Sequence, residues 1–260
     1  MRDIPKEDAT PRKQAAQWAM PRLSRPAPAI QASSPASQLM PVLGLLLLVL
    51  APLLTVGWIG EEVLEQERFA FESPLLLWVH AHTTPALLHL SAALHVLGGP
   101  EVMGPLFVAI PTALWLRQRA QALFALWALG GAVLLNALMK LVFHRPRPEL
   151  WPRTVAENGA SFPSGHSMFA AALCSVAVLL LWRTRWRWPA LGLGVTYCLL
   201  MGGARLVLGV HYPTDVLAGL LTGLAWVYGV WALLGRPGSR AGSQAVVIRP
   251  GRARAMLGRE

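Results

Sequence analysis

Three short segments of this 260-residue sequence combine cations, histidines and a carboxylate that suit phosphate chemistry. They are Lys140–Pro148, Pro163–His166 and Arg205–Asp215. A bound phosphate ester needs several fixed cations around its oxygens, and backbone N–H groups at a helix N-terminus add to them. We expect three cations of these segments to bind phosphate and to spread the charge of a pentacoordinate transition state. They are Lys140, Arg147 and Arg205.

The third segment places a histidine and a carboxylate four residues apart. A helix that begins here would bring His211 and Asp215 to one face. A carboxylate on one imidazole nitrogen fixes the tautomer and leaves the other nitrogen as a nucleophile toward phosphorus. His166, on a different helix, would donate a proton to the departing alcohol. Ser164 and Gly165, which open that helix, are predicted to bind phosphate. The predicted catalytic residues are His211, His166 and Asp215.

The composition indicates an integral membrane protein. Hydrophobic residues make up 54% of the chain and charged residues 14%, yet Lys and Arg outnumber Asp and Glu by 23 to 13. A disordered chain would be less apolar, and a soluble basic nucleic-acid binder would carry more charge, so no nucleic-acid partner is expected. Cys174 and Cys198 are too few for a disulfide scaffold or a zinc site built from cysteines.

The apolar stretches predict an all-α bundle of six transmembrane helices, because about 20 apolar residues cross a bilayer. The stretch at 41–60 carries no charge, and the shorter stretches are expected to borrow flanking residues. Leucines at helical spacing over 85–97 predict an interfacial helical segment between the first two spans, with a seventh span as the alternative. The predicted spans are 41–60, 102–116, 121–139, 167–182, 188–204 and 216–235.

The distribution of charge predicts the topology. The prolines and cations of residues 1–38 indicate a disordered basic tail, and residues 236–260 form a second basic tail after the membrane domain of residues 39–235. With six spans both tails share one side with the arginine-rich loops, which the positive-inside rule assigns to the cytoplasm of a multi-pass cell-membrane protein. The phosphate-binding segments then face the outside or periplasm. Arg205, a cation in an apolar region, is costly at membrane depth and therefore indicates a functional group.

The three segments resemble the signature of the type 2 phosphatidic acid phosphatase (PAP2) superfamily. Its motifs K-x6-R-P, P-S-G-H and (S/A)-R-x5-H-x3-D occur here in order, at Lys140–Pro148, Pro163–His166 and Arg205–Asp215. The resemblance covers roughly residues 40–235 and implies a membrane-bound phosphatase that acts on a lipid phosphate monoester or diphosphate. It also implies a reaction without metal or cofactor, through a phosphohistidine on His211.

Two details of the motifs depart from the simplest pattern. Ala204 precedes the arginine of the third motif where many family members carry Ser, which removes one hydroxyl. Arg145-Pro146 offers a second Arg-Pro register beside Arg147-Pro148. For Glu157, in the loop between the first two motifs, contact with a headgroup and ordinary solvation are alternatives.

The resemblance leaves several substrates and functions open. A phosphorylated lipid among the membrane lipids is the expected partner, with undecaprenyl diphosphate, phosphatidate, phosphatidylglycerophosphate and lipid A phosphate as alternatives. A phosphotransferase that passes the phosphate to a sugar or lipid, or a non-enzymatic lipid-phosphate transporter or binder, would use the same cluster. The sequence carries no code for the lipid's identity or for an oligomeric state. No metal site is expected, because four further histidines lack ligand spacing. They are His80, His82, His89 and His95.

Overall fold

The computed structural model describes residues 35–67 and 69–234, which form eight helices. Apart from residues 35–38, which begin the first helix, both predicted tails lie outside the described residues. In chain order the helices are α1 (Pro35–Leu64), α2 (Glu72–Ala81), α3 (Pro85–Gly98), α4 (Pro100–Trp115), α5 (Arg119–Phe143), α6 (Gly165–Leu181), α7 (Arg187–Val207) and α8 (Pro213–Leu234).

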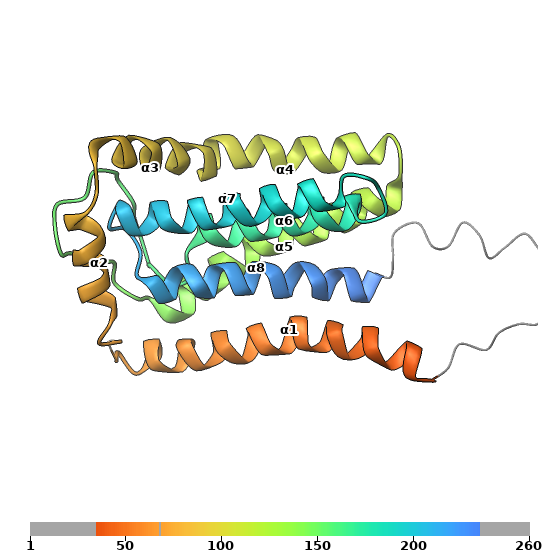
Figure 1. The fold of residues 1–260 in the computed structure, drawn as a ribbon, viewed down its shortest axis with the longest axis horizontal. Coiled ribbons are helices and arrows are strands. Elements are labelled where there is room, and N and C mark those ends of the chain that lie inside the picture. Colours follow the sequence, from red (N-terminus) through yellow and green to blue (C-terminus); the bar gives the residue numbers. More distant parts are fainter. Residues whose placement is uncertain (1–34, 68, 235–260) are drawn as a thin grey trace, which may run out of the picture.

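The long helices run side by side, and α2 crosses one end of the bundle (Figure 1). α6 lies in the centre, where it packs against α5, α7 and α8. α1 packs along α8, α4 packs along α5, and α3 packs against α7. The bundle therefore surrounds the helix that carries the Pro163–His166 motif with neighbours from later and earlier parts of the chain.

Several of the described helices are long and apolar enough to cross a membrane. Four pass by length and hydropathy: residues 43–64 of α1, together with α5, α7 and α8. α3 and α4 pass together as a bent pair, which gives up to five spans, and α6 is apolar but has 17 residues. The structure thus confirms an all-helical, multi-pass membrane protein at the level of four to five candidate spans.

The segment from Pro85, predicted to be an interfacial helix with a seventh span as the alternative, forms α3, which is joined to α4 as a bent pair. α3 and α4 meet at an angle of 42°. Gly99 between them is extended, at φ −78° and ψ 169°, and Pro100 follows it at the first helical position. A proline disfavours helical geometry at the preceding residue, so the helix breaks here and restarts. The helix that does lie across the end is α2 (Figure 1), whose 10 residues the sequence did not single out.

Glycines bring α6 and α8 into backbone contact. A Cβ added at Gly219 would lie 2.5 Å from the carbonyl oxygen of Ser164, and one at Gly223 would lie 2.4 Å from that of Met168. Small residues one turn apart allow two helices in a membrane to approach this closely. The start of α6 is therefore fixed against α8 by backbone contact, close to the residues of the second and third motifs.

A buried cluster of small and aromatic side chains holds the centre of the bundle. It joins α5, α6 and α8, and its smallest members on α5 let α6 approach. Its members are Phe124, Ala125, Ala128, Leu129, Ala132, Met168, Ala172, Val176, Val227 and Val230. Burial of such apolar surface stabilises the bundle and keeps the motif-bearing helix ends in register.

Candidate active site

The three motif segments meet at one end of the bundle. α5 ends there with Lys140 in its last turn, α6 begins there with Gly165 and His166, and the link between α7 and α8 carries His211. The connection between α5 and α6 also runs over this end (Figure 1). The structure thus brings together the segments that the sequence singled out.

His211 is held so that its Nε2 atom carries a lone pair. The side chain is 1% exposed, and Nη1 of Arg147 lies 3.2 Å from Nε2. A guanidinium can only donate, so Nε2 accepts and the ring proton belongs on Nδ1, which lies 3.5 Å from Oδ2 of Asp215. Burial lowers the pKa of His211 and Arg147 lowers it further, against the opposing effect of Asp215. His211 is therefore neutral, with the electron pair that a nucleophile needs on Nε2.

Asp215 connects the third motif to the second. Its carboxylate is fully buried, and Oδ2 accepts a hydrogen bond of 2.8 Å from the backbone N–H of Tyr212. The backbone N–H of Ser164 donates to the carbonyl oxygen of Asp215 at 3.0 Å. The first turn of α8 and the N-cap of α6 are thereby joined directly.

Arg145 supports Asp215 and binds α2 to α8. Nη1 donates to Oδ1 of Asp215 and Nη2 donates to Oε2 of Glu72, both at 2.6 Å. Thr214 accepts from Nη1 at 2.9 Å and donates its hydroxyl to Glu72. Burial alone would lower the pKa of Arg145, but Asp215 and Glu72 raise it above its ordinary value. Of the two Arg-Pro registers, Arg147 therefore faces His211, and Arg145 is engaged by carboxylates.

Cationic and imidazole groups from four parts of the chain surround one carboxylate, that of Glu157. Oε2 lies 3.1 Å from Nη2 of Arg147, and Oε1 lies 3.3 Å from Nη1 of Arg205. Nδ1 of His95 and Nδ1 of His166 lie 3.5 and 3.7 Å from the same Oε1. The Glu157 side chain is 13% exposed. Burial raises its pKa, but Arg147 and then His166 lead a larger opposing effect, so the pKa lies below its ordinary value. The two guanidinium groups of this cluster bind a carboxylate and could bind another oxyanion in its place.

Arg205 has donors left over for such an anion. Its side chain is fully buried, and Nη1 donates to Nδ1 of His95 at 2.9 Å as well as to Glu157. Nε and Nη2 have no hydrogen-bond partner among the described residues. An unpaired buried donor is costly, and a phosphate that accepts from both atoms would remove that cost.

His166 has one nitrogen on the protein and one facing the anion cluster. Its Nε2 lies 3.1 Å from the carbonyl oxygen of His95, which can only accept, so Nε2 carries a proton. Nδ1 then faces Glu157. The two imidazole rings stack, with centroids 5.1 Å apart. In the neutral ring Nδ1 therefore carries a lone pair, and only the doubly protonated ring holds a proton that faces the Glu157 carboxylate.

The remaining predicted phosphate ligands lie at the helix ends. Ser164 is the N-cap of α6, and its Oγ accepts from the backbone N–H of Ser167 at 3.4 Å. Asn136 on α5 donates to the carbonyl oxygen of Pro163 at 3.3 Å and so positions the start of α6. A Cβ on Gly165 would lie 3.1 Å from Oδ1 of Asn136, which favours glycine there.

One group of side chains has the composition of a metal site. Single ligand atoms of His95, Glu157 and His166 all lie within 4.8 Å of one another. However, Nδ1 of His95 already accepts from Arg205, and the carboxylate is shared with Arg205 and Arg147. Two guanidinium groups at the same point repel a cation, so the residues present fit an anion better than a metal ion.

Sequence reasoning missed three residues that the structure places in or beside the cluster. Glu72 was one of several acids before the second span, His95 was one of four unassigned histidines, and Glu157 was a loop residue with two alternative interpretations. None belongs to a short motif. The one available signal was Glu157's position, nine residues before His166 in a loop flanked by two motifs.

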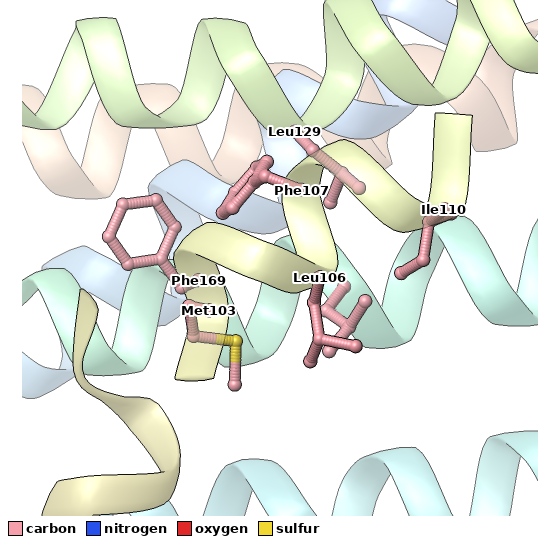
Figure 2. Close-up of a pocket in the computed structure, with 7 residues that line it drawn as sticks. Met103, Leu106, Phe107, Ile110, Leu129 and Phe169 are labelled. Atoms are coloured by element: carbon pink, nitrogen blue, oxygen red, sulfur yellow. The ribbon is translucent and has the colours of Figure 1, made fainter. Parts of the chain in front are cut away.

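A second region of the bundle, an apolar recess, takes no part in this chemistry. Side chains of α4, α5 and α6 line it (Figure 2), and none carries a charged or hydrogen-bonding group that suits a phosphate. They are Met103, Leu106, Phe107, Ile110, Leu129, Phe169 and Leu173.

Known proteins are similar to this chain in sequence and in fold. Residues 121–238 match the family model described as the PAP2 superfamily. Phosphatidylglycerophosphatase B of Bacillus subtilis is 34% identical over 49% of this chain and 66% of its own length. Undecaprenyl-diphosphatase BcrC of the same organism is 34% identical over 45% and 62%. Phosphatidylglycerophosphatase B of Escherichia coli is 41% identical over 27% and 28%. The chain thus matches about two thirds or less of the length of these relatives.

Solved structures show the same arrangement of helices. A transmembrane PAP2 type phosphatidylglycerolphosphate phosphatase from Bacillus subtilis superposes with a TM-score of 0.61 at 26% identity, over 73% of this chain and 94% of that one. LpxE of Aquifex aeolicus superposes with a TM-score of 0.53 at 23% identity, over 63% and 96%, which is a likeness of fold. With the family match over the motif-bearing helices, this likeness confirms the resemblance seen in the sequence: residues 121–238 match the PAP2 superfamily.

Proposed function

We propose that this protein is an integral-membrane lipid phosphatase that acts through a phosphohistidine on His211. The observation that carries the proposal is the convergence of Arg147, Arg205 and His166 on the carboxylate of Glu157, beside the buried Nε2 of His211. A substrate phosphate that takes the place of this carboxylate would meet the cations and the nucleophile together. The relatives named as phosphatidylglycerophosphatase and undecaprenyl-diphosphatase support a phosphorylated lipid as the substrate.

In the proposed mechanism each group performs one step. Nε2 of His211 leaves Arg147 and attacks phosphorus, so that an N–P bond forms while the bond from phosphorus to the lipid oxygen breaks. His166 in its doubly protonated form keeps Nε2–H on His95 and gives its Nδ1 proton to the leaving oxygen. Asp215 stabilises the positive charge on the modified His211 ring.

Hydrolysis of the intermediate reverses these proton movements. Water attacks phosphorus and gives a proton to Nδ1 of His166, the N–P bond breaks, and its electron pair returns to Nε2 of His211. Inorganic phosphate leaves. Lys140, Arg147 and Arg205, with the backbone of Ser164 and Gly165 at the start of α6, are the proposed phosphate ligands in both steps.

The proposed topology has six spans: α1, the bent pair α3–α4, α5, α6, α7 and α8. α6 has 17 residues, about 25 Å at 1.5 Å per residue, and it is enclosed by other helices instead of lipid. Six spans place both tails in the cytoplasm under the positive-inside rule, and the site on the outer face of the cell membrane. The arginine-rich link between α6 and α7, at the end of the bundle away from the site, supports this orientation (Figure 1).

Phosphate release by the purified protein tests the proposal. Detergent-solubilised protein is incubated in EDTA with undecaprenyl diphosphate, phosphatidylglycerophosphate, phosphatidate and lipid A phosphate. We expect release with at least one lipid, its loss in His211→Ala, and an acid-labile phosphoenzyme in the wild type. Loss of activity in EDTA, or activity that survives His211→Ala, would contradict the mechanism. Radiolabel that appears on a sugar or lipid acceptor instead of inorganic phosphate would identify a phosphotransferase.

A further inference from the structure

His95, a residue outside the part of the chain that matches the family model, stands in direct contact with two of the proposed active-site residues. It lies on α3, whereas the match to the PAP2 superfamily covers residues 121–238. Its ring accepts a hydrogen bond from Arg205, and its backbone carbonyl accepts one from His166. Among the described residues of α3, only His95 is hydrogen-bonded to both Arg205 and His166, so the helix reaches the site at this point.

Close packing holds α3 in this position. A Cβ added to Gly98, one turn after His95, would lie 2.8 Å from Cδ2 of His166 and 2.6 Å from Cε of Met201. Leu94 is buried with Ala204 and Met201 in a cluster that joins α3, α6 and α7. The absence of a side chain at Gly98 therefore allows α3 to bring His95 against the site.

The contact with Arg205 determines which edge of the guanidinium remains for a ligand. Nη1 donates to Nδ1 of His95 at 2.9 Å, while Nε and Nη2 have no partner among the described residues. Nε and Nη2 form one edge of the planar group, and such an edge binds two oxygens of a phosphate in parallel. Glu157 shares Nη1 with His95, so His95 remains as the acceptor when a substrate phosphate takes the place of the carboxylate.

We infer that His95 is a positioning residue, which fixes Arg205 so that its Nε–Nη2 edge faces the substrate phosphate and stacks on His166 so that this ring keeps its orientation. The inference rests on the proposed function, because it assigns His95 to the same site. His95 itself transfers no proton and forms no bond to phosphorus.

Two substitutions distinguish the effect of the hydrogen-bond acceptor of His95 from the effect of its stacked ring. His95→Asn places an amide oxygen close to the position of Nδ1 and removes the ring, whereas His95→Phe keeps a ring to stack on His166 and removes the acceptor. His89→Phe is the matched control, since His89 is exposed on the same helix. Orthovanadate, an analogue of the pentacoordinate phosphate, is the probe, and its inhibition constant is measured together with kcat and KM for the lipid that the wild type hydrolyses best.

For His95→Phe we expect the vanadate inhibition constant and KM to rise about tenfold, since a charged hydrogen bond that fixes Arg205 is lost. His95→Asn should keep both constants within about threefold of wild type and should lower kcat, because His166 loses its stacking partner. Equal constants in His95→Phe and wild type would overturn the inference, and so would equal increases in His95→Phe and His95→Asn.

A binding measurement keeps this test independent of turnover. Stabilisation of each variant by orthovanadate against thermal unfolding is recorded in detergent, with the unliganded midpoint of each variant as its own reference. If the wild type hydrolyses no lipid phosphate, the proposed function fails. The inference about His95 is tested separately by the stabilisation that vanadate produces. It is supported if vanadate stabilises His95→Asn as much as the wild type and His95→Phe much less, and it is overturned if all three are stabilised equally.

Discussion

Glu157 places an anion in the candidate site, and under the proposed function a substrate phosphate must displace it. Its carboxylate contacts Arg147 and Arg205, the cations that we assign to phosphate. The low pKa of this carboxylate, which arises because Arg147 and His166 outweigh the effect of burial, keeps it charged at neutral pH. Competition between Glu157 and the phosphate lowers apparent affinity, since only the molecules with the carboxylate displaced bind the ligand.

Glu157→Gln should therefore bind oxyanions more tightly. We expect the inhibition constant of orthovanadate to fall by about tenfold, in line with the loss of a charged competitor from two guanidinium groups. Glu149→Gln is the control on the same loop, because its side chain is 83% exposed and pairs with Arg153 alone among the described residues. An unchanged or increased inhibition constant in Glu157→Gln would show that the carboxylate does not compete.

The pH dependence of activity should report the environment of His211. Burial, assisted by Arg147, lowers the pKa of His211 below its ordinary value of 6.5, so the ring stays neutral into more acid solution. Since only the neutral ring can attack phosphorus, the acid limb of kcat/KM should lie below pH 6.5. An aryl phosphate, whose leaving group needs no proton from His166, isolates this limb. A limb at or above 6.5 would contradict the assignment.

At this scale the sequence predicts residues in motifs and misses residues that depend on folding. Arg147, His166 and Arg205 stand out because spacing and residue type agree over short segments. His95 meets Arg205 across 110 residues of chain, and no local pattern marks that pair. The local sequence around a histidine on an apolar segment does not indicate whether its side chain faces lipid headgroups or an arginine. Tertiary packing alone determines which of the two it contacts.

Among the helices, the contact between α6 and α8 fixes the relative positions of the second and third motifs. Gly219 brings the backbone of α8 against Ser164, the N-cap of α6, and the N–H of Ser164 donates to Asp215 at the start of α8. The second and third motifs are therefore held together by main-chain contacts as well as by side chains.

Gly219→Ala should disturb this contact. The new Cβ would lie 2.5 Å from the carbonyl oxygen of Ser164, so α6 and α8 must separate, and we expect a loss of about 1–3 kcal/mol in stability together with reduced activity. Gly229→Ala on the same helix is the control, since its Cβ meets nothing within 4 Å and alanine favours a helix by up to about 1 kcal/mol. Thermal unfolding in detergent measures both. Equal midpoints for the two variants would contradict the close contact.

The helices themselves were predictable to different degrees. Uncharged apolar runs identify α5, α7 and α8 because each is long enough to dominate a hydropathy window. α2 has 10 residues, and its place across the bundle end depends on the pairing of Glu72 with Arg145, 73 residues away. Gly99-Pro100 predicts a helix break between α3 and α4. It does not indicate whether the second helix continues in nearly the same direction or runs in a different one.

For the whole molecule, the arginine-rich links and the candidate site lie at opposite ends. The links that carry Arg117 and Arg185 lie at one end of the bundle, and the candidate site lies at the other (Figure 1). In the proposed topology, the positive-inside rule assigns the first end to the cytoplasm. The sequence predicted this separation because it follows from the order of spans and loops and requires no side-chain contact.

Thiol labelling in intact cells tests the orientation. In a background with Cys174 and Cys198 replaced by Ala, we expect Glu149→Cys to react with a membrane-impermeant maleimide from outside, because residue 149 lies in the connection at the site end. Arg185→Cys, exposed in the link between α6 and α7, should react only after the membrane is permeabilised. The reverse pattern of labelling would invert the proposed topology.

The glycine contact between α6 and α8 divides the site into a part that tolerates little variation and a part that is free to vary. Residues anchored on that contact cannot move apart without breaking backbone packing, so a new lipid preference has to arise on the opposite wall, formed by α2, α3 and the connection between α5 and α6. Attempts to re-engineer substrate choice should randomise that wall and leave the helix pair intact.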